Sequence, residues 1–173
     1  DRIVLVVGQD GQAIREHFSK MPYAEKISYV VQGEQKGTAH AIAVAADAVG
    51  DSPFIVCNAD TFFEPSFYAK AAAMAKLGTP FVVGKRVDDA SPYGLLQETE
   101  GRLQGVLEKP PEPGPGVIFT GCYFMKPDFF QYLARVGPSP RGELEVTDAI
   151  RAYSQDHTVR LYEHEGYWND VGY

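Results

Sequence analysis

The chain has 173 residues, of which 45% are hydrophobic and 23% charged, and its formal net charge is −7. This length and composition suit one soluble globular domain with a substantial core. The negative charge and the absence of Lys/Arg-rich runs argue against nucleic acid or an anionic membrane as the main partner, and no apolar stretch of the sequence is long enough to span a bilayer.

Strands and helices alternate through the first half of the chain. Apolar runs predict strands over residues 2–8, 27–32, 54–57 and 79–86, and helical spacing or helix propensity predicts helices over 9–20, 38–48 and 65–78. The strands 2–8 and 54–57 are so apolar that we expect both to be fully buried. This alternation predicts a mainly parallel sheet covered by helices.

The pattern changes after residue 88. Strands predicted over 93–98 and 103–107 flank a Glu100–Gly101 turn and form a hairpin. A proline-rich loop over 110–116, a strand over 117–125, helices over 128–135 and 145–155, and a strand over 158–162 complete the chain. We expect a single domain over residues 1–173, with no internal repeat.

The two cysteines, Cys57 and Cys122, lie within apolar strand-like runs. We expect two buried free thiols, which favour a reducing, cytoplasmic location. The four histidines show neither ligand spacing nor a cysteine nearby, so a zinc site is not expected.

Asp60 follows the strand 54–57 in the run Asn58-Ala59-Asp60. Ligands of open α/β sheets bind beyond the carboxyl ends of the strands, so a carboxylate there is a natural metal or phosphate-site residue. The alternative is a simple turn cap.

A glycine-flanked loop, Gly33-Glu34-Gln35-Lys36-Gly37, separates Gln32 from Thr38. Gln32 offers a donor and an acceptor for the edge of a nucleobase, and a helix that begins near Thr38 would direct its positive end at phosphates. Taken alone, the loop is equally well explained as a turn capped by Thr38.

Charged pairs mark two later loops. Glu108 and Lys109 follow a strand, where they could bind sugar hydroxyls and a phosphate or form a solvated ion pair. Asp170 follows the single tryptophan, Trp168. If Asp60 and Asp170 meet in one cleft, they could hold Mg²⁺ with phosphates and water completing its coordination shell.

These motifs, in this order, resemble the sugar-1-phosphate nucleotidylyltransferases, and among them most of all the glucose-1-phosphate thymidylyltransferases. The matching stretches are Gln32 with Gly37 to Ala41, Asn58-Ala59-Asp60, Tyr93-Gly94, Glu108-Lys109-Pro110, Thr120-Gly121-x-Tyr123-Phe124, Pro138 to Asp148, and Trp168 to Gly172. They span nearly the whole chain, and the match over Pro138 to Asp148 is the most specific.

The resemblance implies a Rossmann-like nucleotidyltransferase fold with a β-hairpin insertion. It also implies a reaction that joins dTTP or UTP to a hexose 1-phosphate, such as glucose 1-phosphate, and releases pyrophosphate. The implied nucleotide site consists of Gln32 and Gly37, which would read the base, and Thr38. The implied catalytic residues are Asp60 and Asp170, which would bind Mg²⁺, and Lys109, which would bind the sugar phosphate; Arg141 would be a further phosphate contact. The implied sugar pocket is lined by Tyr93, Gly94, Glu108, Thr120 and Gly121. No nucleophilic side chain is implied, and assembly into a homo-oligomer is possible.

One part of the family pattern has no match in these 173 residues. Members of the family open with a strand and a Gly-rich G-x-G-T-R-L loop that grips the triphosphate, and residue 1 aligns after that region. We therefore expect an internal piece of a nucleotidyltransferase domain that does not turn over alone; pyrophosphate release by this chain would contradict that expectation.

Two alternatives remain open from the sequence. The first is a non-catalytic, sugar-nucleotide-binding or regulatory relative. The second is a metal-dependent glycosyltransferase, a class that usually carries Asp-x-Asp where this chain has Asn58-Ala59-Asp60. A dinucleotide dehydrogenase is set aside, because Gly8-Gln9-Asp10-Gly11 does not complete G-x-G-x-x-G.

Overall fold

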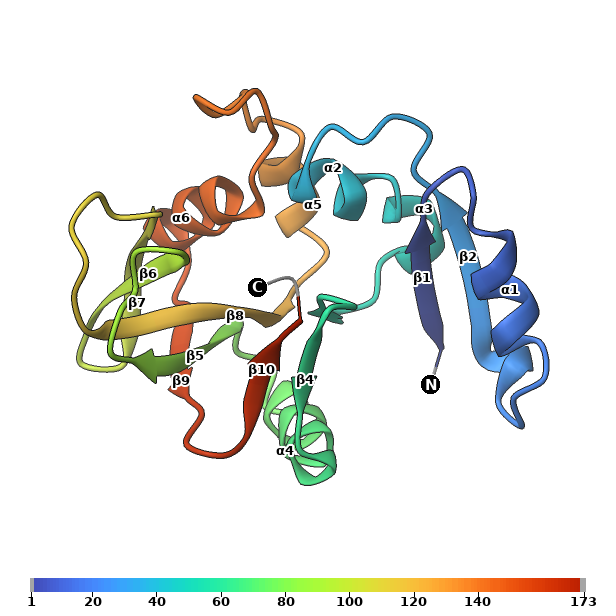
Figure 1. Cartoon of the computed structure of the whole chain (residues 1–173), viewed down its shortest axis with the longest axis horizontal. Coiled ribbons are helices and arrows are strands. Elements are labelled where there is room, and N and C mark those ends of the chain that lie inside the picture. Colours follow the sequence, from blue (N-terminus) through green and yellow to red (C-terminus); the bar gives the residue numbers. More distant parts are fainter. Residues whose placement is uncertain (1, 172–173) are drawn as a thin grey trace. The chain divides into compact units, whose positions relative to one another are not determined.

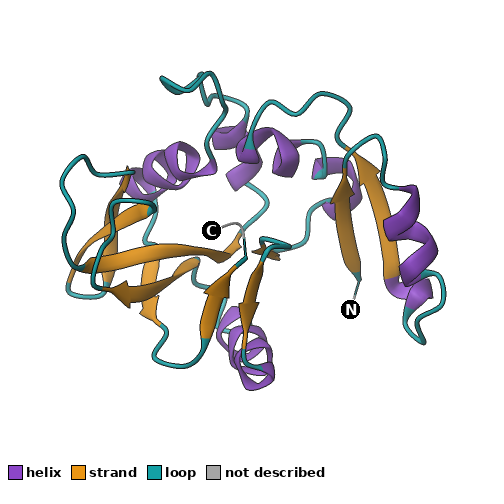
Figure 2. Cartoon of the chain, viewed as in Figure 1, coloured by secondary structure: helices purple, strands orange, loops and turns teal. Residues whose placement is uncertain are grey.

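The computed structural model describes residues 2–171. Its backbone contacts divide the chain into two compact units. Unit 1 comprises residues 1–52 and 130–149, and unit 2 comprises residues 53–129 and 150–173. Figure 2 shows the helices and strands of both units.

Unit 1 is built on a pair of parallel strands. Its elements are β1 (Ile3–Val7), α1 (Gln12–Phe18), the 3₁₀ turn η1 (Ala24–Lys26), β2 (Ile27–Val31), α2 (Thr38–Ala43) and α3 (Ala46–Val49). The single helix predicted over 38–48 is instead two helices, because the chain tightens at the end of α2, where Ala45 N–H donates to the Ile42 carbonyl three residues back. The α-helices α5 (Phe129–Leu133) and α6 (Val146–Asp156) each contribute residues to both units.

Unit 2 contains a six-stranded mixed sheet and a separate two-stranded ribbon (Figure 1). The sheet runs in the order β3-β8-β5-β9-β7-β6 and the ribbon pairs β10 with β4. The elements are β3 (Phe54–Cys57), β4 (Thr61–Phe63), α4 (Pro65–Ala75), β5 (Phe81–Val87), β6 (Gly94–Thr99), β7 (Arg102–Glu108), β8 (Gly116–Met125), β9 (Arg160–Glu163) and β10 (Trp168–Asp170).

The long strand β8 contributes side chains to the packing on both faces of the sheet, because successive side chains of a strand point to opposite faces. Phe124 belongs to the cluster that Phe67 of α4 covers, whereas the neighbouring Tyr123 contacts Phe129, whose ring meets Tyr153 of α6. Figure 1 shows α4 and α6 on opposite sides of this sheet. The two layers of helix cover one sheet, as the α/β prediction requires.

The direction of the strands differs from the expected mainly parallel arrangement. Parallel pairing joins β1 to β2 and β5 to β9, but β3 and β5 both pair with β8 in antiparallel fashion. The sequence pattern missed this because β8 comes from a later part of the chain and separates two strands that are close in sequence. The β6–β7 hairpin was predicted and is confirmed, with positive φ at both turn residues, Glu100 and Gly101.

The expected burial of two strands was wrong. In β3, Ile55 is 38% exposed and Cys57 is exposed; in β1 only Val7 is buried. Among the described strands, β3 pairs only with β8 and β1 pairs only with β2, so each has an open edge. Apolar sequence alone does not distinguish a central strand from an edge strand.

Candidate functional site

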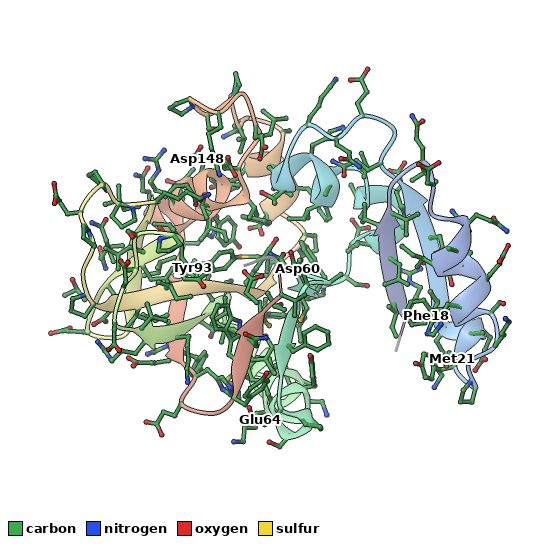
Figure 3. All side chains as sticks on the ribbon, viewed as in Figure 1. Phe18, Met21, Asp60, Glu64, Tyr93 and Asp148 are labelled. Atoms are coloured by element: carbon green, nitrogen blue, oxygen red, sulfur yellow. The ribbon has the colours of Figure 1, made fainter. Side chains whose placement is uncertain are left out.

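A short ribbon in unit 2 brings the two candidate metal ligands next to each other in the backbone. Asp60 lies in the turn between β3 and β4, and its carbonyl accepts a hydrogen bond of 3.0 Å from Val171 N–H. Asp170 lies on β10 directly opposite Thr61. The segments that carry the two carboxylates, far apart in the chain, are therefore adjacent strand ends (Figure 3 marks Asp60).

The turn that carries Asp60 is held by a hydrogen bond to β8 and by another within the turn. Asn58 N–H donates to the Gly121 carbonyl at 3.0 Å, and the Asn58 carbonyl accepts from the Thr61 hydroxyl at 3.0 Å. Asp60 is exposed and Asp170 is half-buried. Because Asp60 precedes the first residue of β4, the alternation of a strand does not dictate where its side chain points.

The donor set suits Mg²⁺ with few protein ligands. Within residues 2–171, no three His, Cys, Asp or Glu side chains are grouped closely enough to form a metal site by themselves. Two carboxylates are the kind of partial site that Mg²⁺ occupies when substrate phosphates and water complete its octahedral shell.

The candidate sugar residues lie on the β6–β7 hairpin and its flanks. Gly94 pairs with Glu108, and Lys109 N–H donates to the Tyr93 carbonyl at 3.0 Å. The Tyr93 ring meets the Trp168 ring edge-on, with centroids 5.8 Å apart. Trp168 and Asp170 are two residues apart on β10 and therefore share a face, which links the hairpin residues to the candidate metal pair.

Lys109 has an unusual backbone. Its φ is +44°, a left-handed conformation that non-glycine residues rarely adopt. Such strain concentrates at functional sites, where surrounding structure holds it in place. Lys109 is exposed, so its ammonium group can reach a ligand.

Thr120 and Gly121 lie at an irregular point of β8, where the Thr120 side chain is buried. The register between β5 and β8 shifts here, and the Thr120 hydroxyl, on a side chain that is 1% exposed, donates to the Val83 carbonyl at 2.8 Å. Gly121 has φ +78°, and a Cβ there would lie 2.6 Å from the Asn58 amide nitrogen. Thr120 therefore supports the geometry of this segment, and Gly121 leaves room for Asn58.

The candidate base-binding residues belong to unit 1. The Gln32 amide nitrogen lies 3.3 Å from the Gly37 carbonyl and 3.0 Å from His40 Nδ1. When the His40 proton is on Nε2, both hydrogens of the Gln32 amide have acceptors. The amide oxygen of Gln32 is then the atom that can accept a hydrogen bond from a ligand. No role for His40 was predicted, although it lies in the matching stretch Gly37 to Ala41.

The glycine-rich loop is held by the Pro138 to Asp148 motif. Leu144 N–H donates to the Lys36 carbonyl at 2.8 Å, Ala39 N–H donates to the Leu144 carbonyl at 2.8 Å, and a Cβ on Gly37 would lie 2.6 Å from the Leu144 backbone. The Thr38 hydroxyl accepts a hydrogen bond from Val146 N–H, the first residue of α6, at 2.9 Å. Thr38 thus caps α6 rather than the helix that it begins.

Arg141 contacts a buried carboxylate. Its guanidinium lies 2.7 Å from Glu145, which is 6% exposed and also accepts from the Ser139 hydroxyl at 3.2 Å. This arrangement orders the loop 139–145. The Arg141 side chain is 43% exposed.

Residues that the sequence did not single out fix the approach to β10. Lys85 donates to the carbonyls of Glu165 and Gly166 at 3.0 and 2.7 Å, and His164 Nε2 lies 3.1 Å from Glu64. Figure 3 marks Glu64, the residue before α4. Contacts to backbone carbonyls leave no pattern in a sequence, so these positioning residues could not be found from it.

A family model for nucleotidyl transferases matches residues 1–173 of the chain. The chain belongs to the nucleotidyl transferase family. The family resemblance inferred from the sequence is confirmed, and this membership sets aside the glycosyltransferase alternative. Residue 172, which closes the last matching motif, lies outside the described residues.

Several curated proteins are similar to this nucleotidyl transferase chain over nearly its full length. The chain is 33% identical over 181 residues to the bifunctional protein GlmU of Methanococcus maripaludis, a match that covers 100% of the chain and 41% of that protein. It is 31% identical to UTP–glucose-1-phosphate uridylyltransferase 2 of Staphylococcus saprophyticus, covering 98% of the chain and 71% of that protein. The chain thus spans about two fifths of the length of several curated relatives that it matches.

Solved structures share the fold. UDP-glucose pyrophosphorylase in complex with UDP-glucose matches with a TM-score of 0.83 and 26% identity, covering 99% of this chain and 76% of that one. A putative glucose-1-phosphate thymidylyltransferase from Bacillus anthracis matches with a TM-score of 0.83 and 26% identity, covering 98% and 70%. The Rossmann-like α/β fold class is confirmed. Among the described residues, no helix is long and apolar enough to cross a membrane.

Proposed function

We propose that this chain is part of an enzyme that joins dTTP or UTP to a hexose 1-phosphate, with glucose 1-phosphate as the expected sugar, and releases pyrophosphate. The observation that carries the proposal is the β4–β10 ribbon, which makes the Asp60 and Asp170 segments adjacent and joins them through Trp168 to Tyr93. The names of the similar proteins, a uridylyltransferase, a UDP-glucose pyrophosphorylase and a putative thymidylyltransferase, support the same reaction class.

Asp60 and Asp170 would hold Mg²⁺. Bound there, the ion would supply charge neutralisation for phosphate oxygens. The reaction brings two anions together, since a sugar phosphate oxygen attacks the α-phosphorus of the nucleotide. The protein's task is therefore positioning and charge stabilisation, and it needs no covalent intermediate.

The sugar phosphate would bind at the hairpin. The ammonium group of Lys109 would contact the phosphate, while Glu108 and the backbone at Gly94 and Gly121 would contact hydroxyl groups. Tyr93, supported by Trp168, would form one wall. In unit 1, Arg141 would contact a phosphate through its guanidinium group.

The bonding of Gln32 supports a uracil or thymine base. Because its amide hydrogens are directed to the Gly37 carbonyl and His40, the amide oxygen is the group left for a ligand. An acceptor matches the N3–H donor of uracil and thymine, a ring position at which cytosine carries no hydrogen. Gly37 and Thr38 would keep this loop in position.

Pyrophosphate release by the protein in its natural length, with each nucleoside triphosphate and glucose 1-phosphate, tests the proposal. We expect turnover with dTTP or UTP at least about tenfold faster than with CTP or ATP, a preference worth about 1.4 kcal/mol. Chelation of Mg²⁺ should abolish turnover, and added Mg²⁺ should restore it. Binding of sugar nucleotides without any pyrophosphate release would instead identify a non-catalytic relative.

A further inference from the structure

The two cysteines of the chain face each other across β3 and β8. Cys57 is directly opposite Cys122, and their sulfur atoms lie 3.4 Å apart. The next pair along the ladder, Asn58 and Gly121, is a hydrogen-bonded pair, with Asn58 N–H donating to the Gly121 carbonyl at 3.0 Å. The cysteines therefore occupy a non-hydrogen-bonded position, where opposing Cα atoms are typically about 4.5 Å apart, at the near end of the range that a disulfide spans.

The two thiols differ in their access to solvent. Cys57 is exposed, contrary to the expectation of two buried thiols, whereas Cys122 is buried in the cluster that includes Phe63 and Phe81. The hydrogen bond between the two sulfur atoms lowers the pKa of Cys57, and the same neighbour raises the pKa of Cys122, as burial also does. Cys57 is thus the sulfur that a reagent in solution can meet first, with a second thiol directly behind it.

We propose that Cys57 and Cys122 are a redox-active pair that closes an intramolecular disulfide when it meets a low-molecular-weight disulfide such as glutathione disulfide. The Cys57 thiolate attacks one sulfur of glutathione disulfide, forming a mixed disulfide and releasing one glutathione thiolate. Cys122 then gives up its proton to solvent and attacks the Cys57 sulfur, releasing the second glutathione thiolate. Two protein thiols are oxidised and one glutathione disulfide is reduced to two glutathiones.

The proposed disulfide would join two segments of the candidate site. Cys57 is the residue before Asn58, whose side chain fills the space beside the Gly121 Cα, and Cys122 is the residue after Gly121. Closing the bond requires the sulfur atoms to approach from 3.4 Å to about 2.05 Å. Oxidation would therefore tether the turn that carries Asp60 to the irregular segment of β8.

The test is thiol mapping of the 173-residue chain after incubation with glutathione disulfide. Because the chain has two cysteines, alkylation with N-ethylmaleimide in denaturant counts the remaining thiols without ambiguity. We expect both alkylation sites to be lost, the protein to stay monomeric on a non-reducing gel, and proteolysis to release one disulfide-linked pair of peptides containing Cys57 and Cys122. The readout is covalent and does not depend on the proposed enzymatic activity.

Two variants make the result decisive. Cys122→Ala should accumulate a stable mixed disulfide between Cys57 and glutathione. In Cys57→Ser, the buried thiol of Cys122 should not react with glutathione disulfide and should be alkylated only in denaturant. Circular dichroism before oxidation checks that both variants are folded. The proposal is overturned if the unmodified chain keeps both thiols, if it stops at the mixed disulfide as Cys122→Ala does, or if it forms disulfide-linked dimers instead.

Discussion

At Gly121, a single missing Cβ sets the geometry of the candidate site. A Cβ would lie 2.6 Å from the Asn58 amide nitrogen, and φ is +78°, where side chains are strained. The motif Thr120-Gly121 was visible in the sequence. Its physical role was not, because the contact with Asn58 depends on the pairing of β3 with β8.

Gly121→Ala should destabilise unit 2 by about 2–3 kcal/mol, since backbone strain and a steric collision act together. The free energy of unfolding, measured in denaturant, checks this. Gly78→Ala is the matched control: its φ of +74° is similar, but nothing lies within 4 Å of its added Cβ, so we expect a loss of only about 1 kcal/mol. Equal losses in the two variants would show that the contact with Asn58 is unimportant.

Lys109 combines a proposed phosphate contact with backbone strain at φ +44°. Lys109→Ala and Lys109→Gly should both weaken binding of the sugar 1-phosphate about 10- to 100-fold, because each removes a charge-assisted contact of about 1.5–3 kcal/mol. Only Lys109→Gly should also raise the free energy of unfolding, by up to about 1 kcal/mol, since glycine tolerates this φ. Calorimetry and denaturant unfolding measure the two effects, and unchanged sugar phosphate binding in both variants would remove Lys109 from the site.

At the scale of elements, the two short strands β4 and β10 determine how the candidate site is assembled. Each has three residues, which is too few for a periodic pattern, so neither was predicted from the sequence. It did single out Asp60 and Asp170, because both belong to family motifs. What could not be predicted is the antiparallel pairing that makes them neighbours, since pairing between distant segments leaves no local signal.

Val171→Pro tests this pairing. The substitution removes the N–H that donates to the Asp60 carbonyl, while the extended conformation of Asp170 in β10 is compatible with a following proline. We expect Mg²⁺ affinity to fall at least about threefold, the equivalent of ~0.7 kcal/mol or roughly one weak hydrogen bond. Val171→Ala keeps the N–H and is the control; if both variants bind Mg²⁺ equally well, the end of the ribbon does not position the site.

For the whole molecule, the order of the elements was predicted well and their arrangement less well. The hairpin, the helix that starts at Pro65 and most strands were found because turns, caps and apolar runs are local properties. The antiparallel insertion of β8 and the open edge of β3 were missed because both depend on which strands pair. The family match spans residues 1–173 even though the contacts divide the chain into two units.

The central proposal is a shared ion between the carboxylates of two adjacent strand ends. Calorimetric titration of Mg²⁺ into the chain saturated with dTDP-glucose or UDP-glucose, for the unmodified protein, Asp60→Asn, Asp170→Asn and the double variant, tests it most directly. We predict that each single variant loses at least about tenfold in Mg²⁺ affinity and that the double variant loses little more, because the two carboxylates serve one ion. Unchanged affinity in either single variant, or losses that simply add in the double variant, would contradict a shared site.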